Sequence, residues 1–474
     1  AFCIWIGFGV AALAKGLQKY GKLSPVIAGS VATVLCLLVP IQMGAQNWDD
    51  HDRSNRYVCR DFGQNYLSTL PEKGNPIIYT NGDNDTFPLW YNQETEGFRT
   101  DARVCNLSYL QTDWYIDQMK RPAYDSPALP ITWDRLEYVS GTNEYIPVRP
   151  EAKAQVLALY KSNPEAAKRE FGDNPFELKN VLKYWIRNKN KDLQIIPTDS
   201  IIVPLDKEAI RRSGMMIPSA LGDSIPDYMT ISLKGKRGLY KSELMMLEML
   251  ANSNWERPIY MAITVGSENH LNLGDNFMQE GLAYRITPFN TTRLDARIDS
   301  EKMYDNLMNK YKFGGIENPD VYLDENVRRM CFTHRRMFAQ VIGQLLKEGK
   351  KDKAVKALEY CEKVIPTTTI PSDYQSGSKD LAQAWFAVGN KEKGAAILDD
   401  MANNSLEYIT WYLSMSNKRL ALSVHECQYY FGLLYDITKI MEMNGLKQAK
   451  DYSDKFEELY TIFAGRAGGQ FNGQ

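Results

Sequence analysis

The sequence has few of the residues that most metal and redox sites need. It contains 4 His and 7 Cys in 474 residues. His270, His334 and His425 each stand alone, and the cysteines form no C-x-x-C pair, so neither a zinc site nor a disulfide framework is expected. Buried free thiols are the default interpretation of the cysteines. We therefore predict no metal and no cofactor.

Common catalytic motifs are also missing. No G-x-S-x-G, P-loop or G-x-G-x-x-G string occurs, so the residues by themselves show no catalytic constellation. The net charge of −2 gives no overall reason to expect nucleic acid or an anionic membrane surface as a partner. Aromatic residues are plentiful, with Tyr 28 and Trp 9. Such side chains are common on sugar-binding and membrane-interface surfaces, and also in protein cores.

Charge is absent from residues 23–48. That length is enough to span a bilayer, which needs roughly 20 apolar residues. Residues 1–14 are also uncharged and apolar, and we expect them to be the remainder of a preceding span that is cut at its start. Three lysines lie between the two segments, and the positive-inside rule places this loop in the cytoplasm. We therefore predict two membrane-spanning segments in residues 1–46, with everything after residue 47 exported.

Two other interpretations of the apolar segments stay open. Residues 15–45 also fit a signal peptide, because residues 43–45 include small side chains suited to cleavage. Both segments also fit buried helices of a soluble protein. A membrane hairpin and a signal peptide have the same consequence, which is export of the bulk of the chain.

Strand and helix patterns alternate from residue 47 to about residue 320. Polar residues near Ser54 predict a helix over 54–67. A strand at 77–79, a helix at 86–96 and a strand at 102–107 predict a βαβ unit. Further patterns predict strands at 201–205 and 258–265, and helices at 152–160, 175–188, 207–213 and 241–251. We expect an exported, Rossmann-like α/β domain over residues 47–320.

Beyond about residue 320 the pattern is helical only and repeats after 40 residues. Three pairs align at this offset: Gly349 with Gly389, Ala354 with Gly394, and Leu358 with Leu398. A glycine turn followed by a small residue on the next helix is typical of tetratricopeptide hairpins, and an imperfect third copy lies at 444–449. We predict a tetratricopeptide-like domain over residues 321–474 that presents a protein- or peptide-binding surface. The alternative is a plain helical bundle.

The string from residue 76 to residue 99 holds most of the candidate site residues. Asp83 and Asp85 follow the first predicted strand, where α/β proteins usually place binding chemistry. Their D-x-D spacing resembles the cation-binding pair of many nucleotide-sugar transferases, and paired carboxylates suit a hard cation. Asp and Asn are also natural turn and N-cap residues, so capping of the next helix is the competing interpretation.

Four further residues of this string are candidates for substrate binding. Trp90, Glu94 and Glu96 lie on the predicted helix, and Arg99 follows it. Glu94 and Glu96 are two positions apart and face different directions on a helix, so they do not form a carboxylate pair. Surface ion pairing with nearby arginines is the simpler explanation of both acids.

A polar cluster follows the second apolar segment. His51, Asp52 and Arg53 lie in it and are added as substrate-binding candidates, because histidine and carboxylates together suit a polar ligand or a metal. A cluster beside a membrane exit is more often a solvated linker or a helix start. We therefore assign it no metal.

Five strings in the chain resemble hallmark sequences of a bacterial multispanning membrane family. They are NWDDHDRSNRY at 47–57, YTNGDNDTFPLWY at 79–91, EGFRTD at 96–101, NWERPIY at 254–260 and YLDENVRRM at 322–330. The family is catalogued as domain of unknown function 2723 and is similar to transmembrane protein 260, an O-mannosyltransferase of the GT-C type. The resemblance spans essentially the whole chain.

The resemblance implies an activity and a position within a longer enzyme. GT-C enzymes use a lipid-phosphate sugar donor, and their catalytic acid lies in the first exported loop, which this chain lacks. The chain then looks like the C-terminal part of the family, on the periplasmic side of a bacterial inner membrane. Its expected partners are the bilayer, a polyprenyl-phosphate sugar and an acceptor protein or peptide, with no nucleic acid. The resemblance also lowers the expectation of a cation at Asp83 and Asp85.

Two functions follow as hypotheses. In the first, the chain is an accessory, acceptor-binding part of a membrane glycosyltransferase and lacks catalytic residues of its own. In the alternative, it is a non-enzymatic envelope binding or scaffold protein that uses its helical repeats. A metal-dependent enzyme centred on Asp83 and Asp85 is a weaker third.

Overall fold

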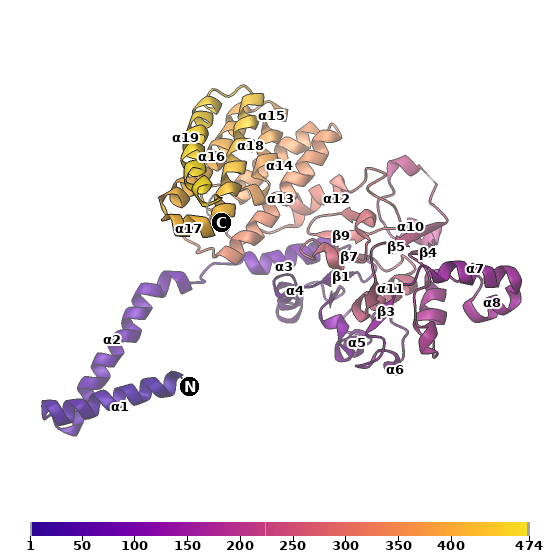
Figure 1. Cartoon of the computed structure of the whole chain (residues 1–474), viewed down its shortest axis with the longest axis horizontal. Coiled ribbons are helices and arrows are strands. Elements are labelled where there is room, and N and C mark those ends of the chain that lie inside the picture. Colours follow the sequence, from indigo (N-terminus) through magenta and orange to yellow (C-terminus); the bar gives the residue numbers. More distant parts are fainter. Residues whose placement is uncertain (1, 223, 472–474) are drawn as a thin grey trace. The chain divides into compact units, whose positions relative to one another are not determined.

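The computed structural model describes residues 2–222 and 224–471. The chain divides into two compact units. The first comprises residues 1–56 and 318–324, and the second comprises residues 57–317 and 325–474. Figure 1 gives the order of the elements along the chain.

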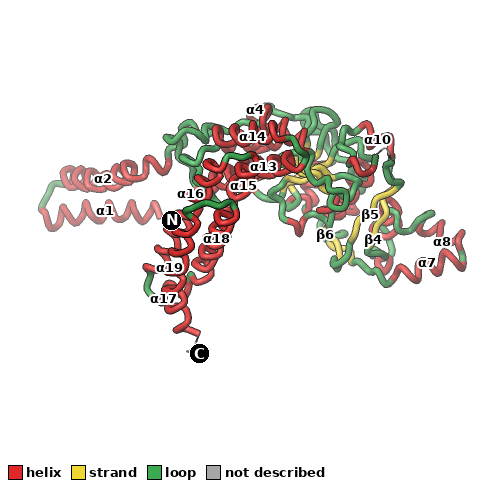
Figure 2. The backbone as a smooth tube through the Cα atoms, turned by 90° about the horizontal axis from the view of Figure 1, so that it is seen from above, coloured by secondary structure: helices red, strands yellow, loops and turns green. Residues whose placement is uncertain are grey.

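Two helices make up most of the first unit. Helix α1 (Phe2–Gly21) packs beside α2 (Pro25–His51), as both Figure 1 and Figure 2 show. Ser24 caps α2 by accepting a hydrogen bond from the Ile27 backbone N–H at 3.4 Å, and Pro25 suits the first helical position. The buried residues of α2 are the small Ala28 and Ala32, one turn apart.

Most of the apolar surface of α2 is exposed, which suits a lipid or signal-sequence environment better than a protein core. Helix α2 is the one helix, among the described residues, that is long and apolar enough to cross a membrane. It therefore fits either a membrane anchor or a signal sequence. The predicted span at residues 1–14 belongs to α1, which also carries Lys15 and Lys19, and a second membrane crossing stays a prediction.

The core of the second unit is a five-stranded mixed sheet. Its strands are β1 (Ile77–Thr80), β2 (Arg103–Asn106), β7 (Ile259–Ala262), β8 (Phe277–Gln279) and β9 (Ala283–Ile286), in the order β2-β1-β7-β9-β8. Strand β1 is parallel to β2 and to β7, whereas β9 is antiparallel to β7 and to β8. Strands β1, β2 and β7 are fully buried, and β1 and β7 are mostly apolar, as strands in the middle of an α/β fold should be.

The predicted βαβ unit is confirmed. Helix α4 (Asp83–Glu96) connects β1 to β2, and the two strands pair in parallel with Ile77 opposite Arg103. The antiparallel half of the sheet was not predicted. The sheet is therefore smaller and more mixed than a doubly wound parallel sheet, and Rossmann-like topology stays a prediction.

Two helices pack closely on this sheet region. Helix α3 (Val58–Thr69) contacts α4, and α11 (Lys241–Ser253) is buried along most of its length and contacts β1, where Tyr79 donates a hydrogen bond to the sulfur of Met249. The predicted helix start at Ser54 is wrong. The chain makes a turn there, with Asn55 at a φ of +59°, and α3 begins at Val58.

The segment between β2 and α11 holds small elements outside the main sheet. Strand β3 (Tyr145–Pro147) pairs with β6 (Gly238–Tyr240), and β4 (Ser200–Pro204) pairs with β5 (Tyr228–Ser232), both antiparallel. The strand predicted at 201–205 is therefore present as β4, in a separate two-stranded ribbon. The segment between β2 and α11 also contains short helices. They are α5 (Asp113–Met119), α6 (Arg135–Tyr138), α7 (Ala152–Ser162), α8 (Pro164–Phe171), α9 (Leu178–Asn180) and α10 (Lys207–Arg212), with a 3-10 turn η1 (Tyr109–Gln111) and a π-helical turn η2 (Val181–Ile186).

The rest of the second unit is helical. Its helices are α12 (Ser300–Asp305), α13 (Glu325–Lys347), α14 (Lys351–Val364), α15 (Ser378–Val388), α16 (Lys391–Ser414), α17 (Asn417–Leu422), α18 (Val424–Met443) and α19 (Ala449–Phe471). Figure 1 shows α13 to α19 in series, from orange to yellow.

Three helical hairpins in this region turn at glycine. Gly349, Gly389 and Gly445 have φ of +74°, +96° and +67°, values that L side chains rarely adopt. Soon after two of these turns come the buried Ala354 and Gly394, as the 40-residue repeat requires. The repeat therefore marks real hairpin positions, and membership of the tetratricopeptide class stays a prediction.

Candidate functional site

A cleft of about 730 Å³ lies at the carboxyl end of β1. It is built by the β1–α4 turn, the segment after β7, one residue of α3 and the start of α13. Its lining residues are Phe62, Asn81, Gly82, Asp83, Asn84, Asp85, Thr264, Gly266, Glu268, Asn326, Arg329, Met330 and Thr333. The edge where parallel strands end is the usual place for ligand binding in α/β sheets.

Asp85 organises the turn at the floor of this cleft. Its carboxylate accepts hydrogen bonds from the Gly82 backbone N–H at 2.9 Å and from the Thr264 hydroxyl at 2.8 Å. The side chain is buried, so both contacts are shielded from water. Asp85 therefore ties the start of α4 to the segment after β7, which is the capping role that its residue type predicted.

Asp83 is placed differently. It is the first residue of α4 and is exposed, and it makes no ion pair with any described residue. Glu268 and Arg329 lie on the same cleft, and Arg329 is itself paired with Glu325 at 2.5 Å. The cleft thus offers carboxylate, amide and guanidinium groups to a polar ligand.

The cleft has no cluster typical of a metal centre. No group of three or more His, Cys, Asp or Glu side chains suited to a metal ion occurs within residues 2–222 and 224–471. One of the two D-x-D acids, Asp85, is also committed to backbone and hydroxyl donors. The chemistry that these residues support is hydrogen bonding to a polar ligand.

The other candidates on α4 lie away from the cleft lining. The Trp90 ring stacks on Tyr109 with centroids 6.2 Å apart, and Glu94 accepts a hydrogen bond from the Tyr124 hydroxyl. Glu96 is paired with Arg60 of α3 at 2.5 Å, and this hydrogen bond lowers the pKa of Glu96. Glu96 therefore joins two helices.

Arg99 is a structural residue. Its guanidinium donates to the backbone carbonyl groups of Leu67 at 2.8 Å, Leu70 at 3.0 Å and Pro71 at 2.7 Å, and it pairs with Asp101. These contacts fix the end of α3 against the α4–β2 turn. They use the donors that a ligand would need.

The polar cluster after the apolar helix belongs to the first unit. His51 Nδ1 lies 2.9 Å from the Asn47 carbonyl oxygen, and Arg53 donates to the Asp50 carbonyl at 2.7 Å. Asp52 accepts from the Ser54 backbone N–H at 2.8 Å, and hydrogen bonding to Ser54 lowers the pKa of Asp52. These are helix-end and turn contacts, as the simpler interpretation expected.

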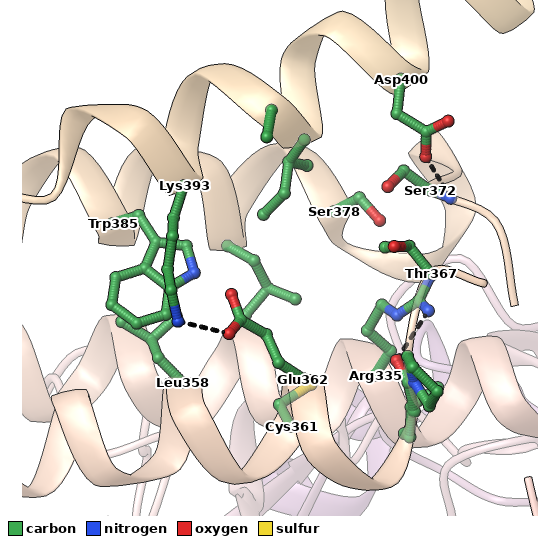
Figure 3. A pocket seen from close by; sticks show the side chains of 15 residues that line it. Arg335, Leu358, Cys361, Glu362, Thr367, Ser372, Ser378, Trp385, Lys393 and Asp400 are labelled. Carbon is green, nitrogen blue, oxygen red and sulfur yellow. Dashed lines mark hydrogen bonds and ion pairs between the residues drawn. The ribbon is translucent and has the colours of Figure 1, made fainter. Parts of the chain in front are cut away.

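A second cavity, of about 320 Å³, lies among the helices α13 to α16 (Figure 3). At one end the Lys393 ammonium lies 4.3 Å from the centroid of the Trp385 ring and is paired with Glu362 at 2.6 Å. At the other end the buried guanidinium of Arg335 donates to the carbonyl groups of Ile365 at 3.0 Å and Pro371 at 2.9 Å. Burial lowers the pKa of Arg335.

The middle of this cavity is apolar, with Leu358, Leu381 and Ile397 among its lining residues. Apolar walls with a few polar groups at the ends are typical of small-ligand and peptide pockets. Sequence reasoning missed Arg335 and Lys393, because a single cation in a helical repeat carries no local signal. It also missed Glu268 and Arg329 at the first cleft, which only the fold brings to Asp83.

Comparison with known proteins identifies the α/β part of the second unit. No curated protein and no solved structure matches the chain. The family model described as TMEM260-associated domain 2 matches residues 59–303, more than half of the chain. The match includes the whole mixed sheet and the β1–α4 turn of the cleft. The chain therefore belongs to the family of TMEM260-associated domain 2.

Proposed function

We propose that this chain is the exported, acceptor-binding region of a membrane glycosyltransferase of the GT-C type. The enzyme would resemble protein O-mannosyltransferases and use a polyprenyl-phosphate sugar as donor. Family membership supports this proposal, as does α2, which is long and apolar enough to be a membrane anchor. In the proposal this anchor lies in a bacterial inner membrane, and the second unit lies on the periplasmic side.

The observation that carries the proposal is the cleft at the carboxyl end of β1. Asp83, Glu268 and Arg329 offer charged hydrogen-bonding groups there, together with the amides of Asn81 and Asn84. This set suits the hydroxyl and amide groups of a polar acceptor. Because Asp85 is committed to the turn, the cleft does not present a D-x-D pair for catalysis. This supports an accessory role, in which the full-length enzyme would supply the catalytic acid from outside this cleft.

The test is sugar transfer from a polyprenyl-phosphate sugar by the full-length protein in lipid nanodiscs. Asp83→Asn and Glu268→Gln should each raise the KM for the acceptor by about tenfold with little change in kcat, because a binding contact is lost and the chemistry is not touched. Asp173→Asn, at an exposed carboxylate outside the cleft, is the matched control. Transfer by this chain alone, or unchanged KM in both cleft variants, would contradict the proposal.

A second candidate is a non-enzymatic envelope binding or scaffold role. The observation that favours it is the cavity among α13 to α16, whose apolar middle and charged ends suit a peptide side chain. Trp385→Ala should then abolish capture of an envelope protein while sugar transfer by the full-length protein stays intact. Loss of transfer in the same variant would favour the first proposal.

A further inference from the structure

One face of α4 carries two acids with aromatic rings between them. Asp83, Phe87, Trp90 and Glu94 are spaced by four, three and four residues, so their side chains share a single helix face. Asp83 and Glu94 are exposed, and the Phe87 side chain is 47% exposed. This face of α4 therefore presents both carboxylates and aromatic surface to solvent.

The row of rings continues onto two neighbouring elements. Trp90 stacks on Tyr109 of η1 with an interplanar angle of 18°, and Tyr109 lies 5.9 Å from Trp114 of α5. Phe87 lies 5.8 Å from Trp90, and Trp114 is 54% exposed. We call these six residues the acid–aromatic surface: Asp83, Phe87, Trp90, Glu94, Tyr109 and Trp114.

Several rings elsewhere in the chain are covered by its own cations. Lys393 lies over Trp385 at 4.3 Å, Lys439 over Tyr435 at 5.5 Å and Arg60 over Tyr57 at 5.9 Å. Within the described part of the chain, no lysine or arginine lies over the four rings of the acid–aromatic surface, and none pairs with its two acids. Helix α4 itself contains no basic residue. The surface therefore combines carboxylates and the electron-rich faces of aromatic rings, which both attract cations.

We propose that the acid–aromatic surface binds a basic, extended segment of a partner protein. Asp83 and Glu94 are eleven residues apart, which is about 16 Å at a rise of about 1.5 Å per residue. An extended peptide covers that distance in about five residues at about 3.3 Å each. The segment would thus carry two cations five positions apart, one for each acid. Where such a cation is an arginine, its planar guanidinium would also stack on the neighbouring rings.

Charge decides between this partner and the other ligands of exposed aromatic surfaces. Anionic lipid headgroups would meet two carboxylates and be repelled. A neutral saccharide would stack on the rings but leave the charge of Asp83 and Glu94 without a counterion. A basic peptide satisfies both the rings and the acids.

The test is binding of a defined probe by the whole chain in detergent micelles, followed by tryptophan fluorescence and calorimetry. The probe is an acetylated and amidated hexapeptide with arginine at both ends and serine and glycine between them. We expect it to bind at least about tenfold more tightly than the same peptide with neutral citrulline at both ends. Its affinity should fall as the salt concentration is raised. The assay contains no sugar donor, so its outcome is separate from that of the transfer assay.

Variants locate the binding. Three variants should each lower the affinity for the arginine peptide by about threefold or more: Glu94→Gln, Asp83→Asn and Trp90→Ala. This is the effect expected for exposed ion pairs and cation–π contacts. Trp411→Ala, which removes a tryptophan on α16 that is as exposed as Trp114, should leave binding of this peptide unchanged. Glu94→Gln is a surface change, so a folding defect of Trp90→Ala would not hide the result.

Three outcomes would overturn the inference. One is equal binding of the arginine and citrulline peptides. Another is unchanged affinity in both Glu94→Gln and Asp83→Asn. The third is binding of a neutral mannose oligosaccharide, or of phosphatidylglycerol vesicles, that Trp90→Ala removes while the arginine peptide fails to bind.

Discussion

His334 makes the stability of the second unit sensitive to acid. It lies on α13, buried among the rings of Phe62 and Phe313, and its Nε2 accepts a hydrogen bond from the Asn65 side-chain amide at 2.9 Å. The orientation of Asn65 is fixed, because its amide also donates to the Lys312 carbonyl and its oxygen accepts from the Lys312 N–H. A proton on Nε2 would therefore face a donor.

Burial lowers the pKa of His334 from 6.5 to about 3. The folded state then binds this proton less tightly than the unfolded chain, so the stabilisation is complete above the unfolded pKa and is lost as the pH falls below it. Between about pH 7.5 and about pH 5 the loss is about 2 kcal/mol, at about 1.4 kcal/mol for each unit below the unfolded pKa.

The measurement is urea unfolding of the whole chain in detergent micelles at both pH values, for the wild type and for His334→Gln. Glutamine accepts the same hydrogen bond from Asn65 but does not titrate, so the difference between the two proteins isolates the imidazole from the many carboxylates that also titrate. We expect the wild type to lose about 2 kcal/mol more than the variant. Equal losses, or an imidazole that titrates near its ordinary pKa in NMR spectra of the folded chain, would refute the reasoning.

Three further predictions concern stability and are checked by urea unfolding. Gly394→Ala should lower the free energy of unfolding by about 1–3 kcal/mol, because its new Cβ would lie 2.6 Å from a ring carbon of the preceding helix. Gly343→Ala has open space around it and should raise the free energy of unfolding by about 0.5–1 kcal/mol. Asp85→Ala should cost about 1–3 kcal/mol and Asp83→Ala no more than about 0.5 kcal/mol, since only the first is buried and hydrogen-bonded; equal costs would contradict the assigned capping role. Glu248→Ala should lower the free energy of unfolding by about 2–4 kcal/mol, because the buried indole N–H of Trp133 and the backbone N–H of Thr132 would lose their acceptor. An unchanged free energy would show that this carboxylate does not hold the loop before α6.

Local sequence patterns predicted the parts of the fold that are formed by residues close to one another in the sequence. The buried run at β1, the turn after it and helix α4 all lie within a stretch of 20 residues, from Ile77 to Glu96. The glycine turns Gly349 and Gly389 were found in the same way, since a positive φ selects glycine whatever surrounds it.

Long-range pairing was not predictable from the same information. The place of β8 and β9 in the sheet depends on pairing of β9 with β7 and of β8 with β9, which no local pattern specifies. The cleft partners of Asp83 come from residues near 268 and 329, and nothing local to either position indicates the other. Arg99 illustrates the converse error, because a charged residue near a candidate site proved to satisfy backbone carbonyl groups.

Helix α13 serves both cavities of the second unit. Thr333 lines the cleft at the end of β1, and Arg335, two positions later, lines the cavity among the hairpins. Its 23 residues form a rod of about 35 Å, and His334 fastens the middle of this rod to α3. A ligand that tilts or rotates α13 to widen one cavity must also alter the other. Any such coupling is reciprocal: a ligand in the hairpin cavity would change the affinity of the sheet cleft for its ligand by the same factor as a ligand in the cleft changes the affinity of the cavity.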